Sequence, residues 1–312
     1  MSWTTADIPD LTGRTAVVTG GNGGLGLESV KALAGAGARV VMGARDQKKA
    51  TAARDEVTRE HPDADVEIVA LDLGSFASVT TAAAQIAAAH PAVDILLNNA
   101  GLMAMPERRT ADGYEMQFGV NHLGHWLFTA GLLAPILTAD AARVVTVTST
   151  AHHMGRVVDP DDVNLEGHYD PWRAYGRAKL ANLHFALGLQ REFERHGVRA
   201  ASLAAHPGLS HTNLQVHTVA EGGGGRSAPF WAWLARRTGM SAADGALSQL
   251  RAATDPGAQG GEFYGPRWVN SGPPVRKPIL RRDLERGIER LWRVSERETG
   301  VAFDFGASRE QG

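Results

Sequence analysis

Short β-branched runs alternate with long alanine-rich stretches, and this alternation is the feature that most restricts the fold. Six runs are almost continuously apolar, as buried parallel strands are: 15–19, 39–42, 66–71, 95–97, 144–148 and 198–203. The intervening stretches predict helices that begin near Leu25, Gln47, Ser75, Asp112, Tyr175 and Ser241. Right-handed crossovers would place these helices on both faces of the sheet, which predicts a Rossmann-like, doubly wound parallel α/β fold.

The 312-residue chain shows no internal repeat, so we predict one domain over 1–312. Its expected parts are a core at about 13–265, a substrate-loop region at about 209–240 and a C-terminal tail at about 266–312. In the tail, the charged stretch 281–297 predicts one more helix, which gives the domain a C-terminal helical extension.

Composition excludes several classes of function. The formal net charge is only −2 and no block of like charges occurs, so we expect no nucleic-acid partner. The absence of cysteine removes disulfides, thiol nucleophiles and thiolate metal sites. Neither a signal segment nor an apolar run of ~20 residues occurs, which predicts a cytoplasmic protein without a membrane anchor.

Twelve histidines raise the question of a metal site. No His-Glu-x-x-His motif occurs, and the pair His122 and His125 has no third ligand nearby in sequence, so we predict no metal. His152, His153 and His211 either line a pocket or are ordinary loop histidines.

Two predicted helices, 114–137 and 178–193, are apolar around most of their circumference. Each must therefore pack against the sheet and against a second surface. That surface is either a partner subunit, in a symmetric homodimer, or another part of the same chain, and we favour the partner.

The pattern loosens after Pro207, where a run of glycines occupies 222–225. Such a run is either a flexible surface connection, which is the commoner case, or the hinge of a substrate lid. Substrate contacts are expected mainly from 151–173 and 209–240, the least regular parts of the chain.

The first predicted strand ends in the glycine-rich segment 19–26, which reads TGGNGGLG and runs directly into a helix. Glycine permits a tight turn and lets backbone N–H groups approach a pyrophosphate at the helix N-terminus. The spacing is Gly-x-x-x-Gly-x-Gly. Because it lies at the start of a βαβ unit, it indicates dinucleotide binding rather than a purely structural turn.

At the end of the second strand, where an NAD enzyme would hold the adenosine ribose with a carboxylate, the chain has Arg45. A guanidinium can pair with a 2′-phosphate and stack on adenine, whereas a carboxylate would repel that phosphate. This favours NADP over NAD. The alternative is a solvated surface arginine, which the neighbouring Asp46 keeps open.

Polar groups also follow the third and fourth strands. Asp72, next to Leu73, could accept a hydrogen bond from the adenine amino group. The segment 98–101, Asn-Asn-Ala-Gly, could hold neighbouring strand ends and the cofactor ribose, or could supply turn residues alone.

Tyr175 and Lys179 are four residues apart on a predicted helix, so both side chains lie on one face. Ser149 follows the fifth strand, at the edge where open α/β sheets bind ligands. Asn121, in the middle of another helix, could position a water near Lys179 and complete a proton path to solvent.

These groups predict general acid catalysis, in which Ser149 holds a carbonyl oxygen, Tyr175 protonates it and Lys179 binds the nicotinamide ribose. An aqueous phenol has a pKa near ~10, so acid–base work at neutral pH requires roughly 4 kcal/mol of preference for phenolate. The ammonium and an oxidised nicotinamide could supply that preference.

We therefore expect interconversion of a ketone or aldehyde and an alcohol on a hydrophobic small molecule. Reduction of a C=C bond conjugated to a carbonyl would use the same acid. A nucleotide-sensing regulator without chemistry is a third interpretation, but it would not need all four polar groups.

These residues resemble the short-chain dehydrogenase/reductase family between about Gly13 and Thr212. The resemblance implies a catalytic set of Asn121, Ser149, Tyr175 and Lys179. It also implies cofactor contacts at these positions: Gly20, Asn22, Gly24, Leu25, Gly26, Arg45, Asp72, Leu73, Asn99, Ala100, Gly101, Tyr175, Lys179, Pro207, Gly208 and Thr212.

The strings at 43–46, 120–125 and 175–182 are most similar to the retinol dehydrogenase and protochlorophyllide reductase branch, which mostly uses NADP and bulky apolar substrates. The chain departs from many relatives at Gly23 and Ala178, where those relatives have serine. Neither departure removes a catalytic group.

Overall fold

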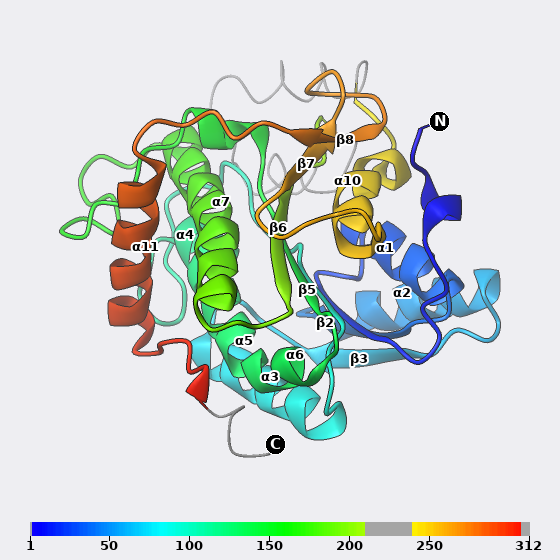
Figure 1. The fold of residues 1–312 in the computed structure, drawn as a ribbon. Coiled ribbons are helices and arrows are strands. Elements are labelled where there is room, and N and C mark those ends of the chain that lie inside the picture. Colours follow the sequence, from blue (N-terminus) through cyan, green and yellow to red (C-terminus); the bar gives the residue numbers. More distant parts are fainter. Residues whose placement is uncertain (1, 210–238, 307–312) are drawn as a thin grey trace.

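A computed structural model describes residues 2–209 and 239–306, and its centre is one eight-stranded sheet (Figure 1). The strands are β1 (Thr15–Thr19), β2 (Arg39–Ala44), β3 (Val66–Ala70), β4 (Ile95–Asn98), β5 (Arg143–Val147), β6 (Ala201–Ala205), β7 (Phe263–Pro266) and β8 (Pro274–Lys277). Their order is β3-β2-β1-β4-β5-β6-β7-β8, and every neighbouring pair is parallel except β7 and β8. The strand order reverses between β1 and β4, which confirms the doubly wound fold class.

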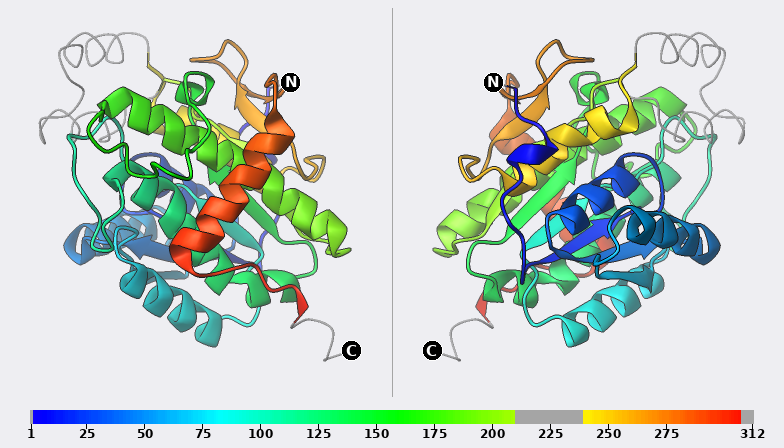
Figure 2. Two further views of the ribbon diagram at one scale, coloured as in Figure 1. Left: turned by 90° about the vertical axis from the view of Figure 1, so that its left-hand side faces the viewer. Right: turned by 90° about the vertical axis from the view of Figure 1, so that its right-hand side faces the viewer.

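Helices cover both faces of this sheet (Figures 1 and 2). They are α1 (Gly24–Gly35), α2 (Gln47–Glu60), α3 (Phe76–Ala89), α4 (Met116–Phe118), α5 (Gly124–Gly131), α6 (Leu133–Thr138), α7 (Pro171–Arg195), α10 (Ala242–Thr254) and α11 (Leu284–Thr299), with short turns η1 (Thr5–Asp7), η2 (Gly119–Leu123) and η3 (Thr150–His153). Val17 packs with α3, α5 and α7, whereas its neighbour Val18 packs with α1, α2 and α10. Burial on both faces explains why the strands are apolar throughout. No helix in these two described ranges is long and apolar enough to cross a bilayer.

Two elements begin later than the sequence pattern predicts. Val198 donates its N–H to the carbonyl of Phe193 at 2.9 Å and so closes the end of α7, which delays β6. The helix predicted from Asp112 begins at Met116, because the Asp112 carboxylate instead accepts from the N–H of Phe76 at the start of α3.

Two other boundaries are also corrected. The helix predicted from Tyr175 begins at Pro171, where Asp170 caps it by accepting from the N–H of Arg173 at 2.7 Å. The sheet continues through β8, beyond the predicted end of the core near residue 265.

The apolar stretch 114–137 is broken into four pieces, α4, η2, α5 and α6, rather than forming one helix. In η2 the ladder takes π-helical geometry, with Gly124 donating to the carbonyl of Gly119. Pro135 in α6 has no N–H to donate to the preceding turn, and the helix is interrupted there, at Leu132 between α5 and α6. The π-helical turn is the piece that carries Asn121.

The outer surface of α5 and α7 is covered by the chain's own C-terminal segment. In Figure 2, α11 lies across α7. Trp126 donates its indole N–H to the carbonyl of Val301 at 2.9 Å, and its ring meets those of Trp292 and Phe303 at centroid distances of 4.8 Å. The preference for a partner subunit at this surface is therefore corrected, and the same-chain alternative holds.

We predict that Gly188→Ala destabilises the protein by about 1–3 kcal/mol, because the added Cβ on α7 would collide with the ring of Trp292 on α11. Denaturant unfolding of the single variants and of the Gly188→Ala/Trp292→Leu double variant measures this. In the Trp292→Leu background the alanine should cost much less. An equal cost in both backgrounds would show that α11 does not pack on α7 as described.

Candidate active site

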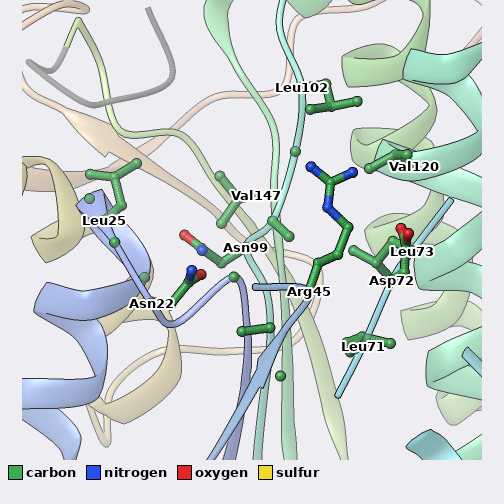
Figure 3. A pocket seen from close by; sticks show the side chains of 18 of the residues that line it. Asn22, Leu25, Arg45, Leu71, Asp72, Leu73, Asn99, Leu102, Val120 and Val147 are labelled. Atoms are coloured by element: carbon green, nitrogen blue, oxygen red, sulfur yellow. The ribbon is translucent and has the colours of Figure 1, made fainter. Parts of the chain in front are cut away.

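A cavity of about 490 Å³ lies along the carboxyl ends of β1 to β5 (Figure 3). Most of the residues predicted to contact the cofactor line it: Gly20, Asn22, Gly24, Leu25, Gly26, Arg45, Asp72, Leu73, Asn99, Ala100, Gly101, Tyr175, Lys179 and Pro207. Gly208 follows Pro207 with φ +69° and packs against Pro266 and the carbonyl of Asn270 instead. Thr212 lies outside the described residues, as do His211 and the glycine run 222–225.

The glycine-rich turn between β1 and α1 is one wall of this cavity. Gly20 and Gly24 have φ values of +67° and +53°, which residues with a side chain rarely adopt. A Cβ at Gly26 would collide with the carbonyl oxygen of Gly20 and lie 2.7 Å from Asn99 Nδ2. The turn thus keeps its backbone bare at the N-terminus of α1, and this cradle fits a pyrophosphate.

Thr19 and Asn99 join the ends of β1 and β4 beneath that turn. The hydroxyl oxygen of Thr19 accepts hydrogen bonds from the N–H groups of Asn99 and Ala100, both at 3.0 Å. The amide Nδ2 of Asn99 donates to the carbonyl of Thr19 at 2.9 Å, and its Oδ1 accepts from Gln249 at 3.1 Å. Asn98 faces away and donates to Thr129. The asparagines thus hold strand ends, as one of their two predicted roles requires.

Arg45 extends from the end of β2 into the cavity (Figure 3). Its side chain is exposed and makes no hydrogen bond or ion pair with any residue in the described ranges. Asp46 also lines the cavity, where it caps α2 by accepting from the N–H of Lys49 at 3.1 Å and lies 3.8 Å from the Lys49 ammonium. Arg45 and Lys49 are therefore the two cations at this end of the cavity, and Lys49 is paired with Asp46.

Asp72 lies at the turn after β3. Its Oδ1 accepts from the N–H of Gly74 at 2.9 Å, and its own N–H donates to Ser78 Oγ. The second carboxylate oxygen has no hydrogen-bond partner within the described part of the chain, so an acceptor faces the cavity where an adenine amino group is predicted.

Tyr175, on α7, lines the other end of the cavity, and its side chain is hydrogen-bonded to Ser149, the N-cap of η3, which is not a lining residue itself. Burial raises the pKa of Tyr175 to about 12, and the hydrogen bond between the Ser149 and Tyr175 side chains acts in the opposite direction. Lys179 does not contribute to this shift in the protein without cofactor, and the prediction that the ammonium acts together with an oxidised nicotinamide stays a prediction. The phenol stays protonated and can donate.

Lys179 lies one turn along α7, with Nζ 5.9 Å from the centre of the Tyr175 ring. The side chain is buried, and burial lowers the pKa of Lys179 to about 8. Nζ donates to the carbonyl of Val147 at 3.1 Å, while Thr148 Oγ1 donates to the carbonyl of Lys179 at 2.6 Å. These bonds fix the ammonium against the end of β5.

Asn121 lies close to Lys179 but does not line the cavity. Its Nδ2 donates to the carbonyl of Leu102 at 2.9 Å and its Oδ1 accepts from the N–H of Leu102 at 2.7 Å. Gly101 separates the two side chains: a Cβ there would lie 3.1 Å from Asn121 Oδ1 and 3.2 Å from Lys179 Nζ. The structure thus places Asn121 beside the ammonium, with both side-chain atoms bonded to the backbone.

His152 and His153 follow Ser149 directly in the turn η3. His152 hydrogen-bonds the carbonyl of Ser149 through Nδ1 at 2.5 Å, and burial lowers its pKa to about 4. Neither His152 nor His153 lines the cavity. Over residues 2–209 and 239–306, no three histidines or carboxylates lie where they could hold a metal ion together.

The sequence reasoning missed several lining residues. Lys49 follows Arg45 by four residues at the start of a helix, a spacing that could have indicated a second cation. Leu102, Met105 and Val120 add apolar surface, and the loop from 102 to 115 gives no periodic signal that could have revealed it.

Comparison with known proteins agrees with this geometry. Residues 14–221 match the short chain dehydrogenase family. The chain is 37% identical over 254 residues to the short-chain dehydrogenase/reductase prx1 of Penicillium roqueforti, covering 79% of this chain and 71% of that protein. It is 35% identical over 300 residues to human retinol dehydrogenase 13, covering 95% and 86%. The crystal structure of an uncharacterised Mycobacterium paratuberculosis protein superposes with a TM-score of 0.77 at 37% identity, covering 97% of this chain and all of the other.

The glycine turn yields a matched pair of predictions. Gly26→Ala should weaken dinucleotide binding by at least about tenfold, because its Cβ cannot be placed without moving Gly20. Gly23→Ala should leave binding nearly unchanged, since no atom lies within 4 Å of that Cβ. Quenching of protein fluorescence by NADPH measures both. Equal affinities for the two variants would contradict the assignment of this turn as the pyrophosphate-binding cradle.

Proposed function

The chain belongs to the short-chain dehydrogenase/reductase family, in its retinol dehydrogenase-like branch, and from that premise we propose that it uses NADP to interconvert a bulky apolar ketone or aldehyde and its alcohol. Oxidoreduction of alcohol and carbonyl groups with a nicotinamide cofactor follows from the family. The choice of NADP, the acid and the apolar substrate are the parts we propose.

The observation that carries the proposal is the convergence of Tyr175 and Lys179 at one end of a cavity whose other end is cationic, with Ser149, which is not a lining residue, hydrogen-bonded to Tyr175. A dinucleotide laid along the strand ends would have its phosphates at the glycine turn and its nicotinamide near Tyr175. Bound there, it supplies the hydride.

In the direction of reduction, Ser149 donates a hydrogen bond to the substrate oxygen and Tyr175 transfers its proton to it. An alkoxide is far more basic than a phenolate, so a phenol whose pKa is about 12 remains a competent donor. Lys179, with a pKa near 8, is mostly charged at neutral pH and stabilises the phenolate left behind.

In the direction of oxidation, Tyr175 must first lose its proton. Lowering its pKa from about 12 to neutral pH requires about 7 kcal/mol. This free energy is larger than that needed for a phenol in water, because burial raises the pKa of Tyr175. Lys179 supplies part of this stabilisation. We propose that Asn121 completes the proton path from Tyr175 to solvent, by holding a water near Lys179.

The preference for NADP rests on Arg45 and Lys49. Arg45 is exposed and has no partner within the described residues, so it can pair with a ribose 2′-phosphate, while Lys49 adds a second cation that Asp46 partly offsets at 3.8 Å. The apolar preference rests on the name of the human relative, a retinol dehydrogenase.

Replacing Tyr175 by Phe should lower turnover by on the order of 10³-fold and leave NADPH affinity unchanged, because only the acidic proton is removed. Turnover is followed by nicotinamide absorbance with a panel of bulky ketones, aldehydes and enones. Tyr114→Phe is the matched control, since that hydroxyl donates to the carbonyl of Glu298, away from the cavity.

A loss smaller than about tenfold in Tyr175→Phe would refute the assignment of the acid. Product analysis of the same reactions distinguishes an alcohol from a saturated ketone, and thus carbonyl reduction from reduction of a conjugated C=C bond.

Replacing Arg45 by Ala should weaken NADPH binding by about 10- to 100-fold, the usual effect of removing a charge-assisted hydrogen bond, with NADH binding unchanged. Arg54→Ala on α2 serves as the control, because Arg54 does not line the cavity and pairs with the exposed Asp55. Equal losses for both cofactors would show that Arg45 does not meet the 2′-phosphate.

A further inference from the structure

His125, in the first turn of α5, touches two separate parts of the site although no reaction step above uses it. The side chain is 1% exposed. Its Nδ1 lies 3.0 Å from the carbonyl oxygen of Asn121, and its Nε2 lies 2.8 Å from Thr19 Oγ1. Both ring nitrogens are therefore engaged with groups that lie next to lining residues of the cavity, Thr19 beside Gly20 and Asn121 beside Val120.

The hydrogen-bond partners fix the tautomer of this ring. A carbonyl oxygen can only accept, so Nδ1 carries the proton that is donated to Asn121. Thr19 Oγ1 already accepts from the N–H groups of Asn99 and Ala100, so no lone pair is left for an N–H of the ring. Its own proton faces Nε2 of His125 at 2.8 Å and the carbonyl of Leu97 at 3.3 Å, and the shorter distance assigns it to Nε2. Every donor and acceptor is satisfied only when His125 is neutral and protonated at Nδ1.

A charged ring would leave its Nε2–H facing a Thr19 oxygen whose lone pairs are already used by Asn99 and Ala100. Burial agrees with this and lowers the pKa of His125 to about 4, with the nearby ammonium of Lys179 acting in the same direction. The hydrogen bond to the backbone carbonyl of Asn121 acts in the opposite direction and raises the pKa of His125, and no carboxylate contributes to the shift.

The two bonds of His125 have different consequences. Through Thr19 the ring supports the turn of Asn99 and Ala100, which lies under the cofactor cradle. Through the carbonyl of Asn121 it anchors the π-helical turn η2, which places the Asn121 side chain beside Gly101 and Lys179.

We propose that His125 is a positioning residue that holds the cofactor cradle through Thr19 and the Asn121 segment through its Nδ1–H, a role that rests on the proposed oxidoreductase function. The bond to Thr19 sets cofactor affinity, and the bond to Asn121 sets the turnover rate.

Two substitutions separate these bonds. The amide nitrogen of Asn occupies the position of Nδ1, so His125→Asn keeps the donor to Asn121 and loses the contact with Thr19. The amide of Gln reaches the position of Nε2, so His125→Gln keeps Thr19 and releases Asn121. His122→Asn and His122→Gln are matched controls, because His122 is equally buried and bonds Ser295 on α11 instead.

His125→Asn should weaken NADPH binding by about threefold to tenfold and keep kcat near that of the wild type. His125→Gln should keep NADPH affinity and lose about 10- to 100-fold in kcat, because a displaced proton path slows the chemical step. The His122 variants should lose thermal stability only. Parallel losses of kcat and affinity in both His125 variants would overturn the proposal.

Nitrogen-15 NMR of the histidine rings gives a readout without turnover. The His125 resonance, assigned by its absence in His125→Asn, should show a neutral ring protonated at Nδ1 at pH 7. Protonation at Nε2 would overturn the proposal. If the wild type reduces no carbonyl at all, the proposed function fails, and NADPH affinity with the NMR tautomer still decides the role of His125.

Discussion

The burial of the Lys179 ammonium beside the Tyr175 phenol is the constraint on which the rest of the site depends. Both side chains are 5% exposed or less, so each is biased toward its neutral form. Burying such a pair raises the free energy of the folded state, and hydrogen bonds that join α7 to the end of β5 offset this penalty. Val147 accepts from both Lys179 and Asn182.

The position of α7 in turn depends on layers far from the cavity. The helix is buried along almost its whole length because β5 and β6 lie beneath it and α11 lies over it. Trp126, Phe185 and Trp292 form one aromatic cluster between these helices. The C-terminal extension thus helps to hold the residues proposed for catalysis, although it contributes no group to the cavity within the described residues.

Sequence reasoning recovered the fold class and most of the cavity lining, because both follow from local rules. Buried parallel strands require continuous apolar runs, and a backbone that approaches a ligand requires glycine, as at Gly20 and Gly26. The element boundaries that were predicted wrongly are set by contacts between distant parts of the chain, such as the hydrogen bond of the Asp112 carboxylate at the N-terminus of α3. Nothing local distinguishes α11 from a partner subunit as the cover for α7, and nothing local shows that His125 bonds Thr19, 106 residues away.

Burial holds Tyr175 protonated until an oxidised nicotinamide adds a second positive charge to that of Lys179. Ultraviolet difference titration of wild type against Tyr175→Phe isolates this phenol among the four tyrosines of the chain. Without cofactor, Tyr175 should show no ionisation below about pH 10, as its raised pKa requires. With saturating oxidised NADP, its ionisation should move down by about two pH units or more. An unchanged titration on adding NADP, or a phenol that already ionises near neutrality in the free protein, would contradict the account.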